Sequence, residues 1–110
     1  MSADACVTYY GIRYEVSADA ITTLETRCDA RVVAARKIGL KTYWGNFGAP
    51  GERYLLFIGA ELGVLGPENH AEIRLGSVDL QKIIDDTSAK LRSAGFAGDA
   101  QLYLQWKADA

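Results

Sequence analysis

The hydrophobic pattern at the start of the chain is that of a strand. Residues 6–16 are rich in β-branched and aromatic side chains and show no helical stripe. Apolar residues occupy both alternating faces of this segment, for example Val7 on one face and Ile12 on the other. We therefore expect this strand to lie inside a sheet and not at its edge.

A core-facing helix is predicted over residues 17–38. Apolar side chains recur there at spacings of three and four residues: Ile21, Leu24, Cys28, Val32 and Ala35. Asp29 is placed to cap a second short helix over residues 30–38, so an interruption at this point is an alternative. We expect Gly39 to end the segment in a left-handed conformation.

Residues 41–75 have the period of strands. Segments 41–47 and 53–58 form a predicted hairpin, because residues 48–51 supply the glycine and proline that turns require. A reversal is allowed after Gly59, and a turn at 66–69 precedes another alternating segment. In that segment Ala71, Ile73 and Leu75 alternate with polar residues. The pattern predicts a meander with half-exposed outer strands.

The chain then returns to a helical period. Residues 77–94 place one apolar stripe against a polar face, with Ser77 as the expected N-cap. Gly95 and Phe96 are typical of a Schellman stop, in which Phe96 contacts Leu91. Over residues 101–107 the period is again that of a strand. We expect its apolar face to be buried (Leu102, Leu104, Trp106) and its other face to be wet (Gln101, Tyr103, Gln105, Lys107).

These segments predict an α+β two-layer sandwich, a mainly antiparallel sheet with two helices on one face, in the order β-α-β-β-(β)-β-α-β. The fold would be ferredoxin-like if segment 59–65 only extends the hairpin, and a larger variant otherwise. Apolar residues on both faces of the first strand exceed what one helical layer needs. The opposite sheet face, with Tyr103 on it, is therefore expected to be open and aromatic, as in a dimer or partner interface.

Length, composition and charge indicate a single domain and make some classes of binding partner less suitable. A chain of 110 residues forms one domain, 1–110, with residues 1–5 expected as a flexible tail. The formal net charge of −2 gives no overall field that would concentrate nucleic acid or acidic lipid. No signal-like or membrane-spanning segment is recognised, so we expect a cytoplasmic protein without membrane contact. Cys6 and Cys28 are then expected as reduced, buried thiols.

The candidate binding residues are mostly aromatic and gather near the glycine-rich turn. They are Tyr43, Trp44, Asn46, Phe47, Tyr103 and Trp106. Aromatic and amide side chains beside a flexible loop are typical of ligand pockets and protein interfaces. The alternative is that the aromatic residues are ordinary sheet core and the glycines only make the turn.

Other chemistry is weakly indicated. His70 beside Glu68 is the candidate acid–base pair, although polar residues are ordinary in such a turn. No metal-ligand spacing or phosphate loop occurs, so we predict neither a metal nor a cofactor. A basic run lies between Arg27 and Lys41, and it would suit a phosphate or an acidic partner unless it is only a solvated helix face.

Three hypotheses follow. The preferred one is a small binding module that acts through an aromatic sheet face, as a homodimer or as an inhibitor or immunity-type partner of another protein. The second is a small enzyme that uses His70 and Glu68 beside a pocket near Trp44, which would take a small-molecule ligand. The third is an RNA-binding module with Tyr43, Trp44 and Tyr103 as stacking platforms, against which the balanced charge argues.

Overall fold

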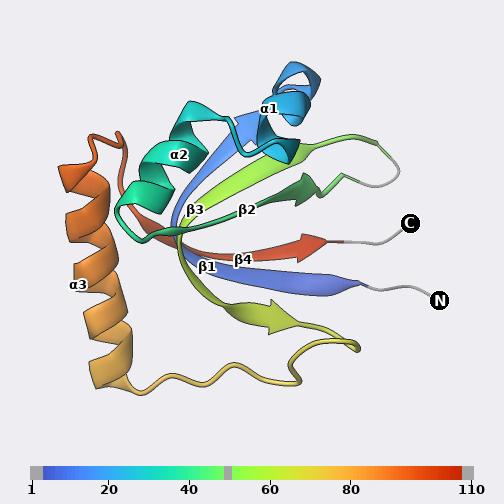
Figure 1. Cartoon of the computed structure of the whole chain (residues 1–110). Coiled ribbons are helices and arrows are strands. Elements are labelled where there is room, and N and C mark those ends of the chain that lie inside the picture. The colour runs from blue at the N-terminus through green and yellow to red at the C-terminus, as the bar shows by residue number, and fades with distance from the viewer. Residues whose placement is uncertain (1–3, 49–50, 108–110) are drawn as a thin grey trace.

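The computed structural model describes residues 4–48 and 51–107, which form an α+β fold with a four-stranded antiparallel sheet and three α-helices (Figure 1). The strands are β1 (Ala5–Val16), β2 (Lys41–Asn46), β3 (Tyr54–Leu65) and β4 (Gln101–Lys107). The helices are α1 (Ile21–Glu25), which follows a 3₁₀ turn at Ala18–Ala20, α2 (Ala30–Lys37) and α3 (Ser77–Ser93). The strand order β2-β3-β1-β4 is roughly compatible with a ferredoxin-like arrangement but does not establish it.

β3 is one continuous strand, so the predicted reversal after Gly59 is wrong. Gly59 lies opposite Gly11 on β1, and a Cβ atom on either glycine would collide with a carbonyl oxygen of the other strand, that of Tyr10 or Ile58. Gly59 also has φ +154°, a conformation that favours glycine. These glycines therefore allow a close approach of two strands instead of making a turn.

The predicted strand at 70–75 is also absent. Residues 66–70 form a tight turn, in which the His70 N–H donates to the Val64 carbonyl at 3.0 Å and the Gly66 N–H donates to the His70 carbonyl at 3.1 Å. After one isolated bridge between Leu65 and His70, the chain runs on to α3 without a ladder. The alternation in this segment was misleading, because Leu75 is exposed and only Ile73 is half-buried.

The first helical region is interrupted where Asp29 indicated. The Asp29 side chain accepts a hydrogen bond from the Arg31 N–H at 2.9 Å and so caps α2. Gly39 ends the segment at φ +80°, as predicted. The expectation of a buried Cys28 is wrong, because Cys28 lies in the link between the two helices and is exposed.

α3 and its C-terminal stop are confirmed. The Phe96 N–H donates to the Leu91 carbonyl at 3.0 Å and the Gly95 N–H donates to the Arg92 carbonyl at 3.1 Å, which is the Schellman pattern. The N-cap is Gly76 and not Ser77, which is the first residue of the helix. None of the helices in the described residues is long and apolar enough to span a membrane.

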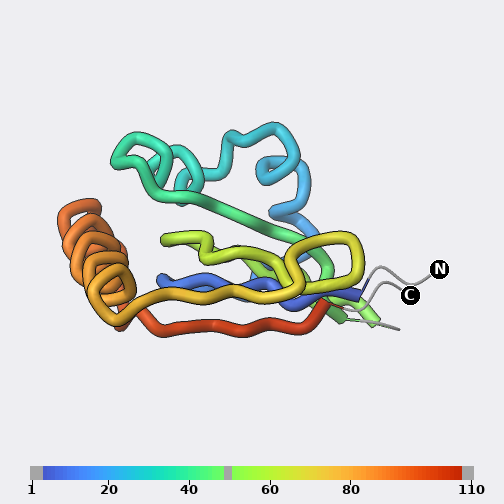
Figure 2. The backbone as a smooth tube through the Cα atoms, turned by 90° about the horizontal axis from the view of Figure 1, so that it is seen from below, coloured from blue at the N-terminus to red at the C-terminus, as the bar shows by residue number. Residues whose placement is uncertain are grey.

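The helices share one core on one face of the sheet. Figure 2 shows α1 and α2 to one side of the strands and α3 beside the strand ends. Side chains from all three helices pack with the sheet in this helix-side core, which consists of Ile12, Leu24, Val32, Ala35, Leu40, Leu56, Ile58 and Leu91. The amphipathic pattern therefore predicted the shared face correctly.

The opposite face is not open, so that part of the prediction is wrong. It holds a second core, the aromatic core, formed by Val7, Tyr9, Phe47, Leu55 and Phe57 with Tyr43 and Tyr103 packed against it. Leu55 and Phe57 are 0 % exposed although no helix of the shared helix-side core packs on this face. Another part of the molecule must therefore exclude water from it.

Curling of the sheet explains this burial. Lys107 on β4 donates a hydrogen bond to the Tyr43 hydroxyl on β2 at 3.2 Å, and a Cβ atom on Gly45 would lie 3.3 Å from the Lys107 Nζ. In a flat sheet these strands would be three spacings apart, roughly 14 Å, which exceeds the reach of a lysine side chain. The two outer strands have therefore approached each other across the aromatic core, as in a partly closed barrel.

The N-terminal segment differs in part from the expected tail. Ala5 is buried and begins β1, whereas residues 1–3 lie outside the described residues. Residues 49 and 50 of the predicted hairpin turn lie outside them as well. Cys6 is a half-buried free thiol on β1, so it is less enclosed than predicted.

Candidate functional site

The predicted binding residues lie in different places. Tyr43, Phe47 and Tyr103 belong to the aromatic core, where their rings make edge contacts, for example Phe57 with Tyr103 at 5.7 Å between centroids. Trp44 packs against the helix-side core on the other face of β2. These aromatic side chains therefore do not form the common stacking platform that the RNA-binding hypothesis requires.

The rim of the aromatic core is closed by polar contacts. The Arg13 guanidinium lies 4.9 Å from the Tyr103 ring centroid and donates a hydrogen bond to Gln105 Oε1 at 2.6 Å.

Inside the aromatic core, burial, and secondarily the charge of Glu61, raises the pKa of the Tyr9 hydroxyl far above its usual range. The aromatic side chains on this face are thus internal structure and not a receptor surface.

Asn46 has a structural role in the hairpin. Its side-chain Oδ1 accepts hydrogen bonds from the backbone N–H groups of Gly48 at 3.1 Å and Arg53 at 3.0 Å. Those contacts join the two ends of the turn, as an Asx-type interaction does. The amide is therefore already engaged within the hairpin.

The candidate acid–base pair lies in the exposed turn after β3. His70 and Glu68 are both exposed, and neither lines the cavity beside Trp44, so the structure does not bring them together with that residue. Across residues 4–48 and 51–107, no group of three or more potential metal ligands gathers. Both side chains therefore lie on the exposed surface of the turn.

An exposed apolar stripe runs along β4. Leu102, Leu104 and Trp106 are 51 %, 62 % and 56 % exposed, which reverses the predicted faces of this strand. They lie on the sheet face that carries the helices, opposite Tyr10, Thr8 and Cys6 of β1. Because β4 is the last strand of the sheet, its outer backbone edge is also unpaired within the sheet.

The position of the helices explains this exposure. α3 packs on β1 and β3, and α2 packs on β2 and β3, so the helical layer covers the inner strands and the other edge. Contiguous apolar surface on an edge strand is unusual in a soluble monomer, where such edges are generally shielded or charged. The apolar stripe is therefore a candidate interaction surface.

A basic cleft lies at the opposite edge of the sheet. It has a volume of about 730 Å³ and is lined by Leu24, Glu25, Arg27, Val32, Arg36, Leu40, Lys41, Thr42, Tyr43 and Trp44. Four consecutive residues of β2 line it, so it runs along the outer edge of that strand. Within the predicted basic run, Arg27, Arg36 and Lys41 thus lie around one cavity instead of being scattered around a helix.

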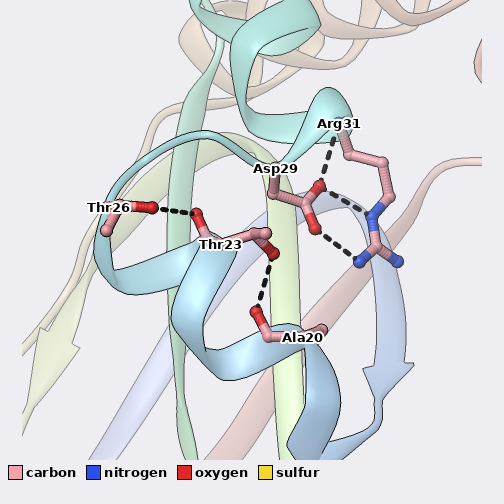
Figure 3. Close-up of polar contacts among 5 residues, drawn as sticks. All are labelled: Ala20, Thr23, Thr26, Asp29 and Arg31. Atoms are coloured by element: carbon pink, nitrogen blue, oxygen red, sulfur yellow. Dashed lines mark hydrogen bonds and ion pairs between the residues drawn. The ribbon is translucent and has the colours of Figure 1, made fainter.

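The wall of the cleft that carries Arg27 is tightly bonded (Figure 3). The Thr23 hydroxyl donates to the Ala20 carbonyl at 2.9 Å, and the Thr26 hydroxyl donates to the Thr22 carbonyl at 2.9 Å and more weakly to the Thr23 carbonyl at 3.4 Å. The link then turns at Arg27, whose φ of +59° is the only positive value among described residues other than glycine. On the far side of the link, Asp29 and Arg31 form a bidentate ion pair with N–O distances of 3.0 and 2.9 Å.

Sequence reasoning found the components of both surfaces but not their arrangement. The basic run and Trp44 were each identified, yet their convergence depends on the break between α1 and α2. The signal for that break was present in Asp29. For β4, period-two alternation identified the strand, but it carries no information about which face the helices cover.

Comparisons with known proteins provide no further guide: no family model matches the chain, and no curated protein or solved structure matches it significantly.

Proposed function

We propose that this protein is a small interaction module that associates with a second copy of itself through β4. The observation that carries the proposal is the apolar stripe: three large hydrophobic side chains, each more than half exposed, on one face of an edge strand. Pairing two such edges would satisfy the free backbone groups and remove the apolar side chains from water together. We also propose that the fold is a curled ferredoxin-like variant, on the basis of its strand order.

The sequence of β4 is suited to pairing with itself. In an antiparallel pair centred on Leu104, Leu102 of one copy lies opposite Trp106 of the other, and Leu104 lies opposite itself. On the other face, Lys107 lies opposite Gln101, so no like charges face each other within the strand. A two-fold interface of this kind is self-complementary and closes at two copies.

Light scattering coupled to gel filtration tests the proposal. Over loading concentrations of about 1 to 100 µM, the range for a modest interface, the mass should rise from one chain to two. Leu104→Glu should remain a single chain, because it places two carboxylates at the centre of the pair. Val78→Glu is the matched control, since Val78 is 80 % exposed but lies on α3.

A single-chain mass for the wild type at every concentration would overturn the proposal. It would equally be overturned if Leu104→Glu dimerised normally, or if Val78→Glu abolished the dimer as completely as Leu104→Glu. Circular dichroism of each variant verifies that the sheet is retained.

A further inference from the structure

The basic cleft brings together positive charges from three separate elements. Arg27 comes from the link between α1 and α2, Arg36 from α2 and Lys41 from β2, while Glu25 is the single acidic residue of the lining. No ion pair engages these three cations within the described residues, whereas Arg31 and Arg53 are both paired. Converging cations of this kind favour an anionic occupant.

The cleft also presents one edge of β2, which no other strand among residues 4–48 and 51–107 pairs with. The Phe47 N–H donates to the Arg53 carbonyl at 2.8 Å, and Phe47 continues the register of β2 with β3. Because hydrogen-bonded positions alternate along an antiparallel ladder, the backbone groups of Thr42 and Trp44 point away from β3. β2 is the end strand of the sheet, so these groups point to the outer side of the strand, where the cleft lies.

The lining of the cleft also includes apolar side chains. Leu24, Val32 and Leu40 are buried side chains of the helix-side core that reach the cleft, and Trp44 stands half-buried beside them. An extended peptide projects alternate side chains to opposite sides. One set of peptide side chains would face the apolar lining beside Trp44, and the other set would face the cations of the cleft.

We propose that the basic cleft binds an extended acidic peptide segment of another protein, which adds a strand to the free edge of β2. Main-chain hydrogen bonds to Thr42 and Trp44 give this mode its affinity, and alternate side chains give specificity. Carboxylates of the peptide pair with Arg27, Arg36 and Lys41. A compact phosphate would use the cations but not the strand edge, and the net charge of −2 does not favour a polynucleotide.

The wall of the cleft is already ordered before such a segment binds. The backbone on both sides of Arg27 is held by hydrogen bonds of Thr23 and Thr26 and by the Asp29–Arg31 pair, which fixes the start of α2 (Figure 3). The Arg31 guanidinium also lies 5.1 Å from the Tyr14 ring centroid, which attaches this corner to β1. Little ordering of the wall is then required on binding, so less of the binding free energy is lost.

Nuclear magnetic resonance titration with a blocked hexapeptide of alternating glutamate and valine tests the proposal. The backbone N–H signals of Thr42 and Trp44 and the Trp44 indole N–H signal should shift, while the Trp106 indole signal should not. The double variant Arg36→Gln/Lys41→Gln should bind about three- to tenfold more weakly, as expected for two exposed ion pairs. Arg74→Gln/Lys82→Gln is the charge-matched control, because both residues are exposed and lie outside the cleft.

Two control ligands separate strand addition from simple anion binding. A hexapeptide of the same charge in which proline replaces each valine cannot form a strand ladder, so it should bind more weakly. Inorganic phosphate should not shift the Thr42 N–H signal. Equal binding of the proline peptide, an unchanged affinity of Arg36→Gln/Lys41→Gln, or shifts confined to residues 101–107 would each overturn the proposal.

Discussion

Asp29 shows how one residue can organise a corner of the molecule. It is buried, caps α2 through the Arg31 N–H and pairs with the Arg31 guanidinium. This role could be predicted from sequence, because capping depends on residues close in the chain. The exposure of the neighbouring Cys28 could not be predicted from sequence. It results from the left-handed turn at Arg27, which moves Cys28 away from the helical stripe.

The same residue predicts how stability depends on pH. The hydrogen bond from Arg31 holds the pKa of the Asp29 carboxyl below its usual value, despite an opposing effect of burial. A lowered pKa in the folded state means that the stabilisation is complete above the ordinary value of about 4 and is lost as the pH falls through the lowered value. Asp29→Asn keeps a capping oxygen but removes the charge.

We therefore expect the free energy of unfolding of the wild type to fall by about 1 kcal/mol more than that of Asp29→Asn when the pH is lowered below 4. Urea denaturation at a series of pH values measures this difference. Parallel pH profiles for the two proteins would show that the ion pair contributes nothing.

At the scale of the element, β3 depends on a pair of glycines. Sequence rules treat glycine as a turn signal, and they failed at Gly59 because its partner Gly11 lies far away in the sequence. The register between β1 and β3 also shifts between Thr8 and Tyr9, two residues before Gly11 in β1. Close contact and irregular pairing at one place increase the bend of the sheet. The curl that buries the aromatic core therefore arises from long-range pairing.

Gly59→Ala is expected to lower the free energy of unfolding by about 2 kcal/mol or more, because its Cβ atom would collide with the Tyr10 carbonyl and force the strands apart. Thermal or urea denaturation measures the change. Gly51→Ala is the control, since a Cβ atom there meets nothing within 4 Å. A Gly59→Ala protein as stable as the control would contradict the proposed role of this glycine pair.

On the scale of the whole molecule, β3 joins the two cores. Leu56 and Ile58 face the helix-side core while Leu55 and Phe57 face the aromatic core, and all four are 0 % exposed. From the apolar residues on both strand faces we expected one face of the sheet to stay open, whereas both faces of this strand are covered. What covers the second face could not be predicted, because it is the sheet itself and not another segment with a readable period.

A strand shared between both cores should make the fold one cooperative unit. We expect the slowest amide hydrogen exchange in residues 55–58 of β3, at the rate of global unfolding. Unfolding curves from circular dichroism and from tryptophan fluorescence should coincide. Separate transitions would show that the two cores unfold independently.

The pairing of β1 with β4 has a consequence for the rate of folding. Ala5 lies opposite Lys107, so this contact closes a loop of nearly the entire described chain. Contacts so remote in sequence form late, since the entropy of closing the loop is lost before any contact compensates for it. The hairpin of β2 and β3 is local and is expected to form first, with the last strand docking as the final step of a slow reaction.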